Sequence, residues 1–340
     1  MKIGINGFGR IGKIIFKALI EKNNSITREE DKIDIVQIND IADPSTLAHL
    51  LKYDSIYGTY PLPVESDANH LIVNGKKILV TIQKDIKQIP WTEGIELIIE
   101  STGMFTTHEQ ASSHLRGSVK RVLITAPSKD ADAMIVLGVN EKIYDPRKHF
   151  IVSNASCTTN SLAPAVRVLH ENFGMERGFM TTVHAYTTDQ RILDLPHKDP
   201  RRARAGAINI IPTTTGAADA VGIVIPELKG KLTGISLRVP SPSVSITDFV
   251  CTVKKATTKE EVNAKFKEAS ETYLKGILDI TMEPLVSSDF KGCPMSGTID
   301  GLSTNVVDGT FIKMLSWYDN EWGYSCRTAE LVNFIQQKGK

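Results

Sequence analysis

The amino-terminal segment constrains the fold of this 340-residue chain more than any other feature. The apolar run from Lys2 to Asn6 predicts a buried strand, and the glycines at positions 7, 9 and 12 predict a tight turn behind it. The next residues are apolar with the period of a helix: Ile14, Ile15, Ala18 and Leu19. Strand, glycine turn and helix in this order begin a βαβ nucleotide-binding unit, although such glycines can also form a simple turn.

A carboxylate follows the second predicted strand. Residues 33–38 predict a second strand, which ends at Asn39 and Asp40. In a βαβ unit, a carboxylate at this place accepts hydrogen bonds from the ribose hydroxyls of an adenosine. Asp40 taken alone could equally cap the next helix, which Asp43 and Pro44 are expected to begin. Together, the glycine turn and Asp40 favour dinucleotide binding.

The strand pattern changes along the chain and predicts two domains of an α/β protein. Short apolar strands at 71–73, 77–82, 96–99, 121–125, 133–137 and 150–153 predict a Rossmann-type doubly wound sheet, with a type I′ hairpin at Asn74-Gly75. Longer alternating strands at 234–239, 244–253 and 311–317 predict an α+β domain with a mostly antiparallel sheet. Within it, Thr257 and Glu260 predict a capping box. A helical pattern at 328–336 is expected to return to the first domain, so the predicted domains are 1–156 with 321–340, and 157–320.

Composition favours a small molecule as the partner. The 40 basic and 39 acidic side chains give a formal net charge of +1, so no overall field attracts nucleic acid or an anionic membrane. No apolar run approaches the roughly 20 residues of a membrane helix, and polar residues interrupt the amino terminus, so we expect no targeting segment. The four cysteines show neither a disulfide nor a metal-ligand pattern. We expect a cytoplasmic protein that binds no membrane, no nucleic acid and no metal.

Cys157 differs from the other cysteines in its setting. The octapeptide Ser-Asn-Ala-Ser-Cys-Thr-Thr-Asn at 153–160 follows a predicted strand and precedes a helical pattern over 162–169. At a helix amino terminus, the dipole and the free N–H groups lower the pKa of a thiol from about 8.5. We therefore predict a nucleophilic cysteine here and expect the other cysteines to be inert.

His184 is the candidate partner of Cys157. It follows residues 179–183, which predict a strand, and thus lies at the end of that strand. A histidine within reach of a cysteine can hold the thiolate as an ion pair and later donate a proton. The spacing alone favours a structural histidine, which is also the interpretation of the other seven histidines.

Several motifs extend this pattern over the whole chain. The most specific are the cysteine octapeptide and Trp-Tyr-Asp-Asn-Glu at 317–321. The others are Asn-Gly-Phe-Gly-Arg-Ile-Gly at 6–12, Ser-Thr-Gly at 101–103, His184 with Thr187 and Asp189, Thr-Thr-Thr-Gly-Ala-Ala at 213–218, and Arg-Val-Pro at 238–240. In these motifs the chain resembles the phosphorylating glyceraldehyde-3-phosphate dehydrogenase family.

The resemblance implies a role for each matching residue. Cys157 resembles the nucleophile, and His184 resembles the base that activates it and then the acid that stabilises the hemithioacetal oxygen. The implied site for the attacking phosphate consists of Ser156, Thr158, Thr215 and Gly216. The implied site for the substrate's own phosphate consists of Thr187, Asp189 and Arg238. The implied NAD contacts are Gly7, Gly9, Arg10, Ile11, Asp40, Ser101, Thr125 and Asn320, with Lys84 where an arginine near the adenosine is common.

The implied reaction is the oxidation of glyceraldehyde 3-phosphate to 1,3-bisphosphoglycerate, in glycolysis or gluconeogenesis, with NAD and inorganic phosphate. It proceeds through a cysteine thioester and phosphorolysis. The resemblance further implies a homotetramer, and it interprets the basic run from His197 to Arg204 as part of a loop and not as a nucleic-acid patch. Asp40 is expected to favour NAD over NADP, because a 2′-phosphate would face its carboxylate.

Two other functions fit part of the pattern. Erythrose-4-phosphate dehydrogenase shares the cysteine motif but not the Thr-Gly-Ala-Ala found here at 215–218, which favours the triose substrate. A non-catalytic NAD-binding regulator or adhesin on the same scaffold would not need Cys157, His184 and two anion sites. Ser161 stands where the family often has a second cysteine, so a disulfide with Cys157 at this place is not available.

Overall fold

The computed structural model describes residues 1–339 and forms two compact units. Unit 1 consists of Met1–Ile135, Lys142–Asn154 and Thr328–Lys340, and unit 2 consists of Val136–Glu141 and Ala155–Arg327. The main crossings between the units lie at 154/155 and 327/328, close to the domain limits expected at 156/157 and 320/321. The short excursion of residues 136–141 into unit 2 has no counterpart in the sequence prediction.

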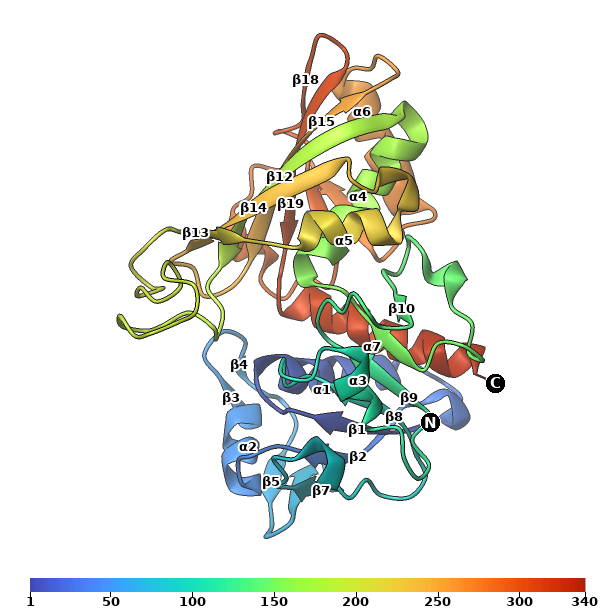
Figure 1. Cartoon of the computed structure of the whole chain (residues 1–340), viewed down its shortest axis with the longest axis vertical. Coiled ribbons are helices and arrows are strands. Elements are labelled where there is room, and N and C mark those ends of the chain that lie inside the picture. Colours follow the sequence, from blue (N-terminus) through green and yellow to red (C-terminus); the bar gives the residue numbers. More distant parts are fainter. Residues whose placement is uncertain (340) are drawn as a thin grey trace. The chain divides into compact units, whose positions relative to one another are not determined.

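Unit 1 is built on a nine-stranded sheet in the order β10-β11-β9-β8-β1-β2-β7-β6-β5 (Figure 1). The strands from β10 to β7 run parallel to their neighbours, and the β7, β6 and β5 strands are antiparallel. The bounds are β1 Lys2–Asn6, β2 Asp34–Asn39, β5 Val64–Ser66, β6 His70–Val73, β7 Lys76–Thr81, β8 Ile95–Glu100, β9 Arg121–Ile124, β10 Ala133–Met134 and β11 Ile151–Ser153. The chain winds outward from β1 in both directions, which confirms the doubly wound sheet.

The predicted glycine turn, helix cap and hairpin of unit 1 are all present in the structure. The helix α1, Arg10–Asn24, follows the glycine turn, and α2, Pro44–Lys52, begins where Asp43 accepts hydrogen bonds from the backbone of Ser45 and Thr46. Asn74 and Gly75 both have positive φ, 50° and 77°, as the predicted type I′ hairpin requires. The strand expected at 133–137 ends already at Met134, because the chain enters unit 2 at Val136. The remaining elements are α3 His108–Ser112 and the two-stranded β3 Tyr53–Asp54 and β4 Gly58–Thr59.

Unit 2 contains an eight-stranded sheet in the order β13-β14-β12-β15-β19-β17-β16, with β18 beside β19. Its bounds are β12 Met175–Ala185, β13 Ile211–Thr214, β14 Leu232–Val239, β15 Ser245–Val253, β16 Leu278–Thr281, β17 Gly297–Asp300, β18 Asn305–Val307 and β19 Phe311–Tyr318. Only the β12/β14 and β16/β17 pairs are parallel. The predicted, mostly antiparallel sheet is therefore confirmed.

Helices cover one face of this sheet. Helices α4, Cys157–Phe173, and α5, Ala217–Val224, contact each other and the strands β12 and β14, as Figure 1 shows, and α6, Lys259–Glu271, packs beside β16. The predicted capping box of α6 is one residue early: Thr258 is the cap and accepts from the backbone N–H of Glu261. The hydroxyl of Thr257 instead donates to the Glu261 carboxylate.

The last helix, α7, runs from Trp322 to Lys338, starting six residues before the predicted helical pattern. Its residues up to Arg327 belong to unit 2 and the later ones to unit 1. Among the helices described for residues 1–339, none is both long enough and apolar enough to span a lipid bilayer.

Candidate active site

Cys157 is the first residue of helix α4. Ala155, two residues before Cys157, has a positive φ of 54°, which turns the chain away from β11. Its carbonyl oxygen accepts a hydrogen bond from the hydroxyl of Tyr324. Ser156 caps the helix by accepting from the backbone N–H of Thr159 at 3.0 Å. This cap makes the helix begin five residues before the apolar pattern that predicted it. The predicted place of Cys157 at a helix amino terminus is confirmed.

The alternation of strand β12 turns His184 toward helix α4. Met180, Thr182 and His184 are buried on the helix-covered face, whereas Phe179 points to the other face and is 45% exposed. On the covered face, Nε2 of His184 lies 3.4 Å from Sγ of Cys157. The structure thus brings together the two residues that the sequence could place only on separate elements.

Two groups compete for the other ring nitrogen of His184. Nδ1 lies 2.7 Å from the backbone oxygen of Ala185 and also contacts the guanidinium of Arg238, which pairs with His184 in the β12/β14 register. A guanidinium can only donate, and a carbonyl can only accept. When Nδ1 donates to Ala185, Nε2 carries the lone pair that faces Cys157. This tautomer is the one that can remove the proton of the thiol.

Burial dominates the proton equilibria of this pair. It raises the pKa of Cys157, although Arg238 and Thr158 act to lower it. Burial together with the charge of Arg238 lowers the pKa of His184 to about 3. The expectation that the helix terminus would lower the pKa of the thiol is therefore wrong, because desolvation outweighs the donors that the helix supplies. At neutral pH the imidazole of His184 is therefore uncharged, and its Nε2 faces the thiol.

A buried chain of hydroxyls lies behind Cys157. The phenol of Tyr318 contacts the hydroxyl of Thr158 at 2.8 Å and that of Thr182 at 2.9 Å. Thr158 is 4% exposed, and burial raises the pKa of Tyr318. These contacts tie α4, β12 and β19 together at the level of the cysteine. Either oxygen of the contact with Tyr318 can be the donor, so the hydroxyl of Thr158 can donate to an anion while it accepts from the phenol.

Asp189 organises the residues after strand β12. Its carboxylate accepts from the hydroxyl of Thr187 and forms an ion pair with Arg202 at 2.7 Å. Burial acts to raise the pKa of Asp189, but the hydrogen bond from Thr187 and the charges of Arg238 and Arg202 outweigh it and hold the pKa below its usual value. Arg202 also donates to the hydroxyl of Thr213 at 2.9 Å. The result is a cluster of cations and hydroxyls suited to anions.

The amino terminus of α5 lies directly after this cluster. Gly216 is the residue before the helix. A Cβ at this position would meet no atom within 4 Å, so the backbone is accessible there. The hydroxyl of Thr215 accepts from the N–H of Ala217 at 3.2 Å. A helix amino terminus with free N–H groups favours a bound anion.

The glycine turn of unit 1 leaves room for a phosphate. Gly7 has a φ of +89°, and a Cβ there would lie 2.7 Å from the nitrogen of Thr102. A Cβ at Gly12 would lie 2.1 Å from the oxygen of Gly7, whereas one at Gly9 would meet nothing within 4 Å. Ser101 donates to the oxygen of Gly7 at 2.6 Å and holds the turn. The turn is therefore tight inside and open at Gly9, as a dinucleotide pyrophosphate requires.

The other predicted cofactor residues surround the same sheet edge. Asp40 accepts from the backbone of Phe8 at 2.6 Å and of Ala42 at 3.0 Å, which ties it to the glycine turn. Thr125 donates from its hydroxyl to the oxygen of Glu100 at 3.1 Å. Ile11 lies in the first turn of α1 and Lys84 is exposed after β7. Arg10 pairs with Asp54 at 3.0 Å.

Asn320 belongs to unit 2, unlike the other predicted cofactor residues. It follows β19, is 5% exposed, and accepts from the hydroxyl of Ser245 at 3.0 Å through Oδ1. The same hydroxyl accepts from the backbone of Ala185, next to His184. Asn320 is thereby held on the unit that carries the cysteine.

Comparison with known proteins covers nearly the whole chain. The glyceraldehyde 3-phosphate dehydrogenase NAD binding domain matches residues 1–108, and the C-terminal domain of the same enzyme matches residues 156–320. The chain belongs to the glyceraldehyde-3-phosphate dehydrogenase family. It is 54% identical to the glyceraldehyde-3-phosphate dehydrogenase of Geobacillus stearothermophilus over 100% of this chain and 99% of the relative. It is 53% identical to glyceraldehyde-3-phosphate dehydrogenase 1 of Bacillus subtilis over the same shares.

Within this glyceraldehyde-3-phosphate dehydrogenase fold, Arg202 is the residue that the sequence analysis missed. It was assigned with its basic neighbours to a structural loop, yet it reaches Asp189 and Thr213. Nothing in the spacing of the run distinguishes Arg202 from Arg201 or Arg204, because the distinction depends on which side chain the loop turns inward. Among residues 1–339, no group of three His, Cys, Asp or Glu side chains is placed to hold a metal ion.

Proposed function

We propose that this chain is an NAD-dependent, phosphorylating glyceraldehyde-3-phosphate dehydrogenase in which Cys157 is the nucleophile and His184 the acid and base. The observation that carries this proposal is the 3.4 Å contact between Sγ and Nε2, with Nδ1 of the same ring on a backbone carbonyl. Nucleophilic catalysis needs a base that faces the thiol and is held in place by a hydrogen bond at its other ring nitrogen. The family match over both domains agrees with it.

The residues then act in a fixed sequence. His184 takes the proton of Cys157, and the sulfur attacks the aldehyde carbon to form a hemithioacetal, whose oxygen His184 stabilises as an acid. NAD, when bound, would accept the hydride that this carbon loses, while His184 takes the proton of the hemithioacetal hydroxyl as the thioester forms. The resulting thioester is attacked by an oxygen of inorganic phosphate, and the C–S bond breaks. The acyl phosphate leaves, the electron pair of the broken bond stays on Sγ of Cys157, and the thiolate takes back the proton that His184 holds.

Two anion sites serve the two phosphates of the reaction. We assign Thr187, Arg238 and Asp189 to the substrate's own phosphate, and Ser156, Thr158, Thr215 and Gly216 to the attacking phosphate. Asp189 carries a negative charge and cannot bind a phosphate directly, so it acts by holding Thr187 and Arg202. Arg202 is assigned as an additional cation of this cluster. Arginine and hydroxyl donors suit phosphate because its oxygens accept several hydrogen bonds at once.

The adenosine and the pyrophosphate of NAD are assigned to unit 1, with the pyrophosphate at the glycine turn and the adenosine ribose at Asp40. Gly7, Gly9, Arg10 and Ile11 form the turn and the start of α1, and the further contacts are Lys84, Ser101, Thr125 and Asn320. We propose residues 1–156 with 321–340 as the NAD-binding domain and 157–320 as the catalytic domain. The open backbone at Gly9 supports this assignment.

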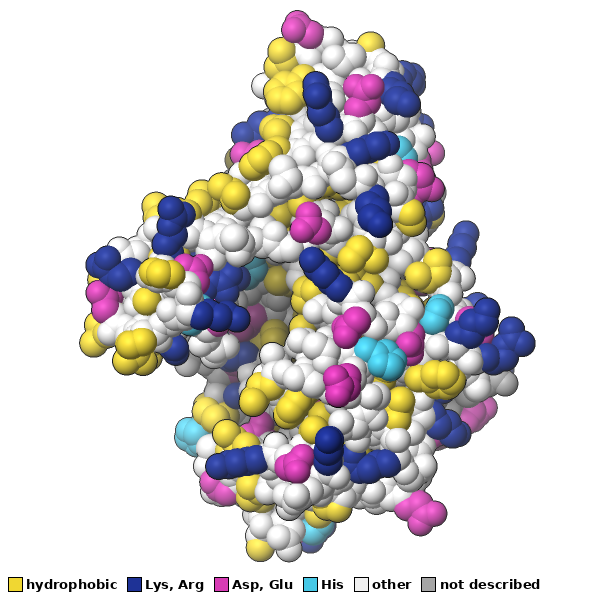
Figure 2. Space-filling view, in the orientation of Figure 1, with side chains coloured by type: hydrophobic (Ala, Val, Ile, Leu, Met, Phe, Trp, Pro, Cys, Tyr) yellow, Lys and Arg dark blue, Asp and Glu magenta, His cyan; other side chains and the backbone are white. Residues whose placement is uncertain are grey.

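We further propose that the protein is a cytoplasmic homotetramer. The sheet face of unit 2 opposite α4 and α5 exposes Phe179 and Ile235, by 45% and 42%. Residues 186–210, between β12 and β13, expose Ile192, Leu193, Leu195, Ile208 and Ile210. In Figure 2 apolar and basic side chains gather on this protruding segment, which Figure 1 shows beside β13. Apolar surface of this extent suits contact with further copies of the chain, and light scattering that finds a fully active monomer would exclude it.

One assay tests the activity. NADH formation is measured with glyceraldehyde 3-phosphate, with and without phosphate or arsenate, and with erythrose 4-phosphate as the competing aldehyde. We expect turnover that needs the anion and prefers the triose. Equal turnover without any anion would contradict phosphorolysis. A preference for the tetrose would identify the chain as an erythrose-4-phosphate dehydrogenase instead.

A further inference from the structure

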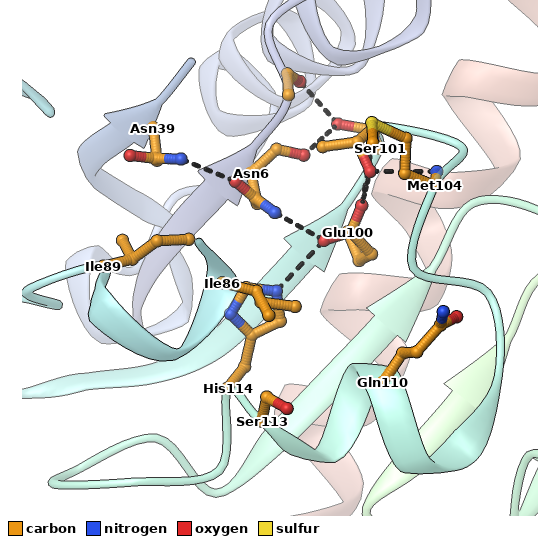
Figure 3. Close-up of polar contacts among 12 residues, drawn as sticks. Asn6, Asn39, Ile86, Ile89, Glu100, Ser101, Met104, Gln110, Ser113 and His114 are labelled. Atoms are coloured by element: carbon orange, nitrogen blue, oxygen red, sulfur yellow. Dashed lines mark hydrogen bonds and ion pairs between the residues drawn. The ribbon is translucent and has the colours of Figure 1, made fainter. Parts of the chain in front are cut away.

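Three neighbouring strands of unit 1 end in buried polar residues that contact one another. The register of β8, β1 and β2 pairs Asn6 with Glu100 on one side and with Asn39 on the other. Nδ2 of Asn39 donates to Oδ1 of Asn6 at 2.9 Å, and Nδ2 of Asn6 donates to Oε2 of Glu100 at 2.6 Å. Figure 3 shows these bonds. We call Glu100, Asn6 and Asn39 the strand-end row.

The carboxylate of Glu100 anchors one end of this row. Besides Asn6, it accepts from Nε2 of His114 at 3.0 Å and from the backbone and hydroxyl of Thr102. Nδ1 of His114 accepts from the indole of Trp91 at 3.1 Å, so the ring presents its N–H to Glu100. Glu100 is 2% exposed and His114 is fully buried. Four donors around a buried carboxylate leave it no freedom to turn.

The amide of Asn39 anchors the other end. It accepts from the backbone N–H of Gln83 at 3.1 Å and donates to the backbone oxygen of Gln83 at 2.9 Å. The amide therefore bonds Gln83 in both directions, as the backbone of a neighbouring strand would. Lys84 is the next residue, so the row also fixes where the segment after β7 begins.

Each member of the row directly precedes a segment assigned to the cofactor. Asn6 precedes Gly7, Asn39 precedes Asp40, and Glu100 precedes Ser101. The backbones are joined as well, since Gly7 donates to the oxygen of Asn39 and Ser101 to that of Asn6, both at 2.8 Å. The spacing between the glycine turn, the ribose carboxylate and the Ser101 segment thus depends on the row beneath them.

We propose that the strand-end row is a positioning device for the adenosine half of NAD. Its members are buried under the binding edge and act through Gly7, Asp40 and Lys84, so they set cofactor affinity without taking part in the chemistry. The proposal rests on the NAD contacts assigned above. It predicts that damage to the row weakens the binding of any ligand that contains the adenosine and pyrophosphate, whether or not a nicotinamide is attached.

The test uses two variants at opposite ends of the row in the full-length protein. Asn39→Asp replaces the donor that serves Asn6 and Gln83 by an oxygen, and Glu100→Gln places an amide against groups that donate. Calorimetry measures the Kd of NAD and of ADP-ribose, which lacks the nicotinamide. We expect both Kd values to rise by the same factor, about tenfold, while kcat at saturating NAD and the KM of the aldehyde stay within about twofold.

Gln37→Ala is the matched control. Gln37 lies two residues before Asn39 on the same strand, is fully buried, and bonds Thr81, Pro90 and Thr92. It contacts no member of the row directly and reaches Asn39 only through the hydroxyl of Thr81. We expect this variant to lower Tm and to leave both Kd values unchanged.

Unchanged Kd values in Asn39→Asp, or a rise no larger than in Gln37→Ala, would overturn the proposal. If Glu100→Gln does not fold, Asn39→Ala still decides it, because this variant removes the neutral hydrogen bonds of Asn39 to Asn6 and Gln83 and buries no charge. A wild-type protein that binds neither NAD nor ADP-ribose would overturn the proposed function itself, and this outcome is distinct from equal binding by wild type and variants.

Discussion

Sγ of Cys157 lies 3.4 Å from Nε2 of His184, within a site where burial raises the pKa of the thiol and lowers that of the imidazole. Cys157 is the first residue of α4, and His184 lies on the buried face of β12. Because burial opposes ionisation of the thiol, we expect the reactivity of Cys157 to depend on the base beside it.

Loss of either member of this pair is expected to stop turnover. Cys157→Ser removes the nucleophile and leaves almost no activity. His184→Asn removes the base, so NADH formation and alkylation of Cys157 by iodoacetamide at neutral pH both slow by about a hundredfold or more. Cys293→Ser, at another half-buried cysteine, serves as the control and keeps normal turnover. Rapid alkylation in His184→Asn would show that the thiol ionises without help.

The depressed pKa of His184 predicts a specific loss of stability in acid. The folded protein holds this group with a pKa of about 3, whereas an unfolded chain protonates it near the ordinary value of about 6.5. Above about pH 6.5 this group therefore costs the free energy of unfolding nothing. Below that pH the free energy of unfolding falls by about 1.4 kcal/mol per pH unit as the pH drops toward 3. Urea unfolding at neutral and at mildly acidic pH should show a smaller acid loss in His184→Asn than in the wild type. Equal losses would mean that His184 protonates in the folded state.

Arg202 is expected to matter for phosphate and not for folding. Arg202→Leu removes the cation that pairs with Asp189, so the KM of glyceraldehyde 3-phosphate or of inorganic phosphate should rise about tenfold while Tm changes little. Arg204→Gln is the control, because it removes the same charge from the same loop where Arg204 pairs with Asp194 at the surface. Steady-state kinetics with each substrate varied in turn will show which phosphate Arg202 serves. The same KM values in both variants would remove Arg202 from the site.

Asp40 is expected to make NAD the preferred cofactor. Its carboxylate is held by the backbone of Phe8 and Ala42, and the next residue, Ile41, is 70% exposed and offers no donor for a 2′-phosphate. The ratio of kcat/KM for NAD to that for NADP should therefore be large, and it should fall in Asp40→Ala combined with Leu195→Ala and Pro196→Ser. Equal efficiencies in the wild type would contradict the prediction, as would a triple variant that gains nothing with NADP.

Local features of the chain were readable from the sequence because they depend on neighbours in sequence. The β1 strand, the glycine turn and α1 follow from periodicity and from the backbone freedom of Gly7. The hairpin at Asn74-Gly75 and the cap at Asp43 follow from the conformations that these residues favour. The roles of Cys157 and Asp40 required more than periodicity, namely motifs that resemble a known family.

Tertiary structure decided what depends on segments far apart in sequence. His184 meets Cys157 because β12 lies under α4, and Arg202 turns inward because its loop folds back to Asp189. The pKa of Cys157 was predicted in the wrong direction, since desolvation depends on every atom packed around the sulfur and not on the helix terminus alone. The strand-end row had no sequence signal either: Asn6, Asn39 and Glu100 become neighbours only through the order of the parallel strands.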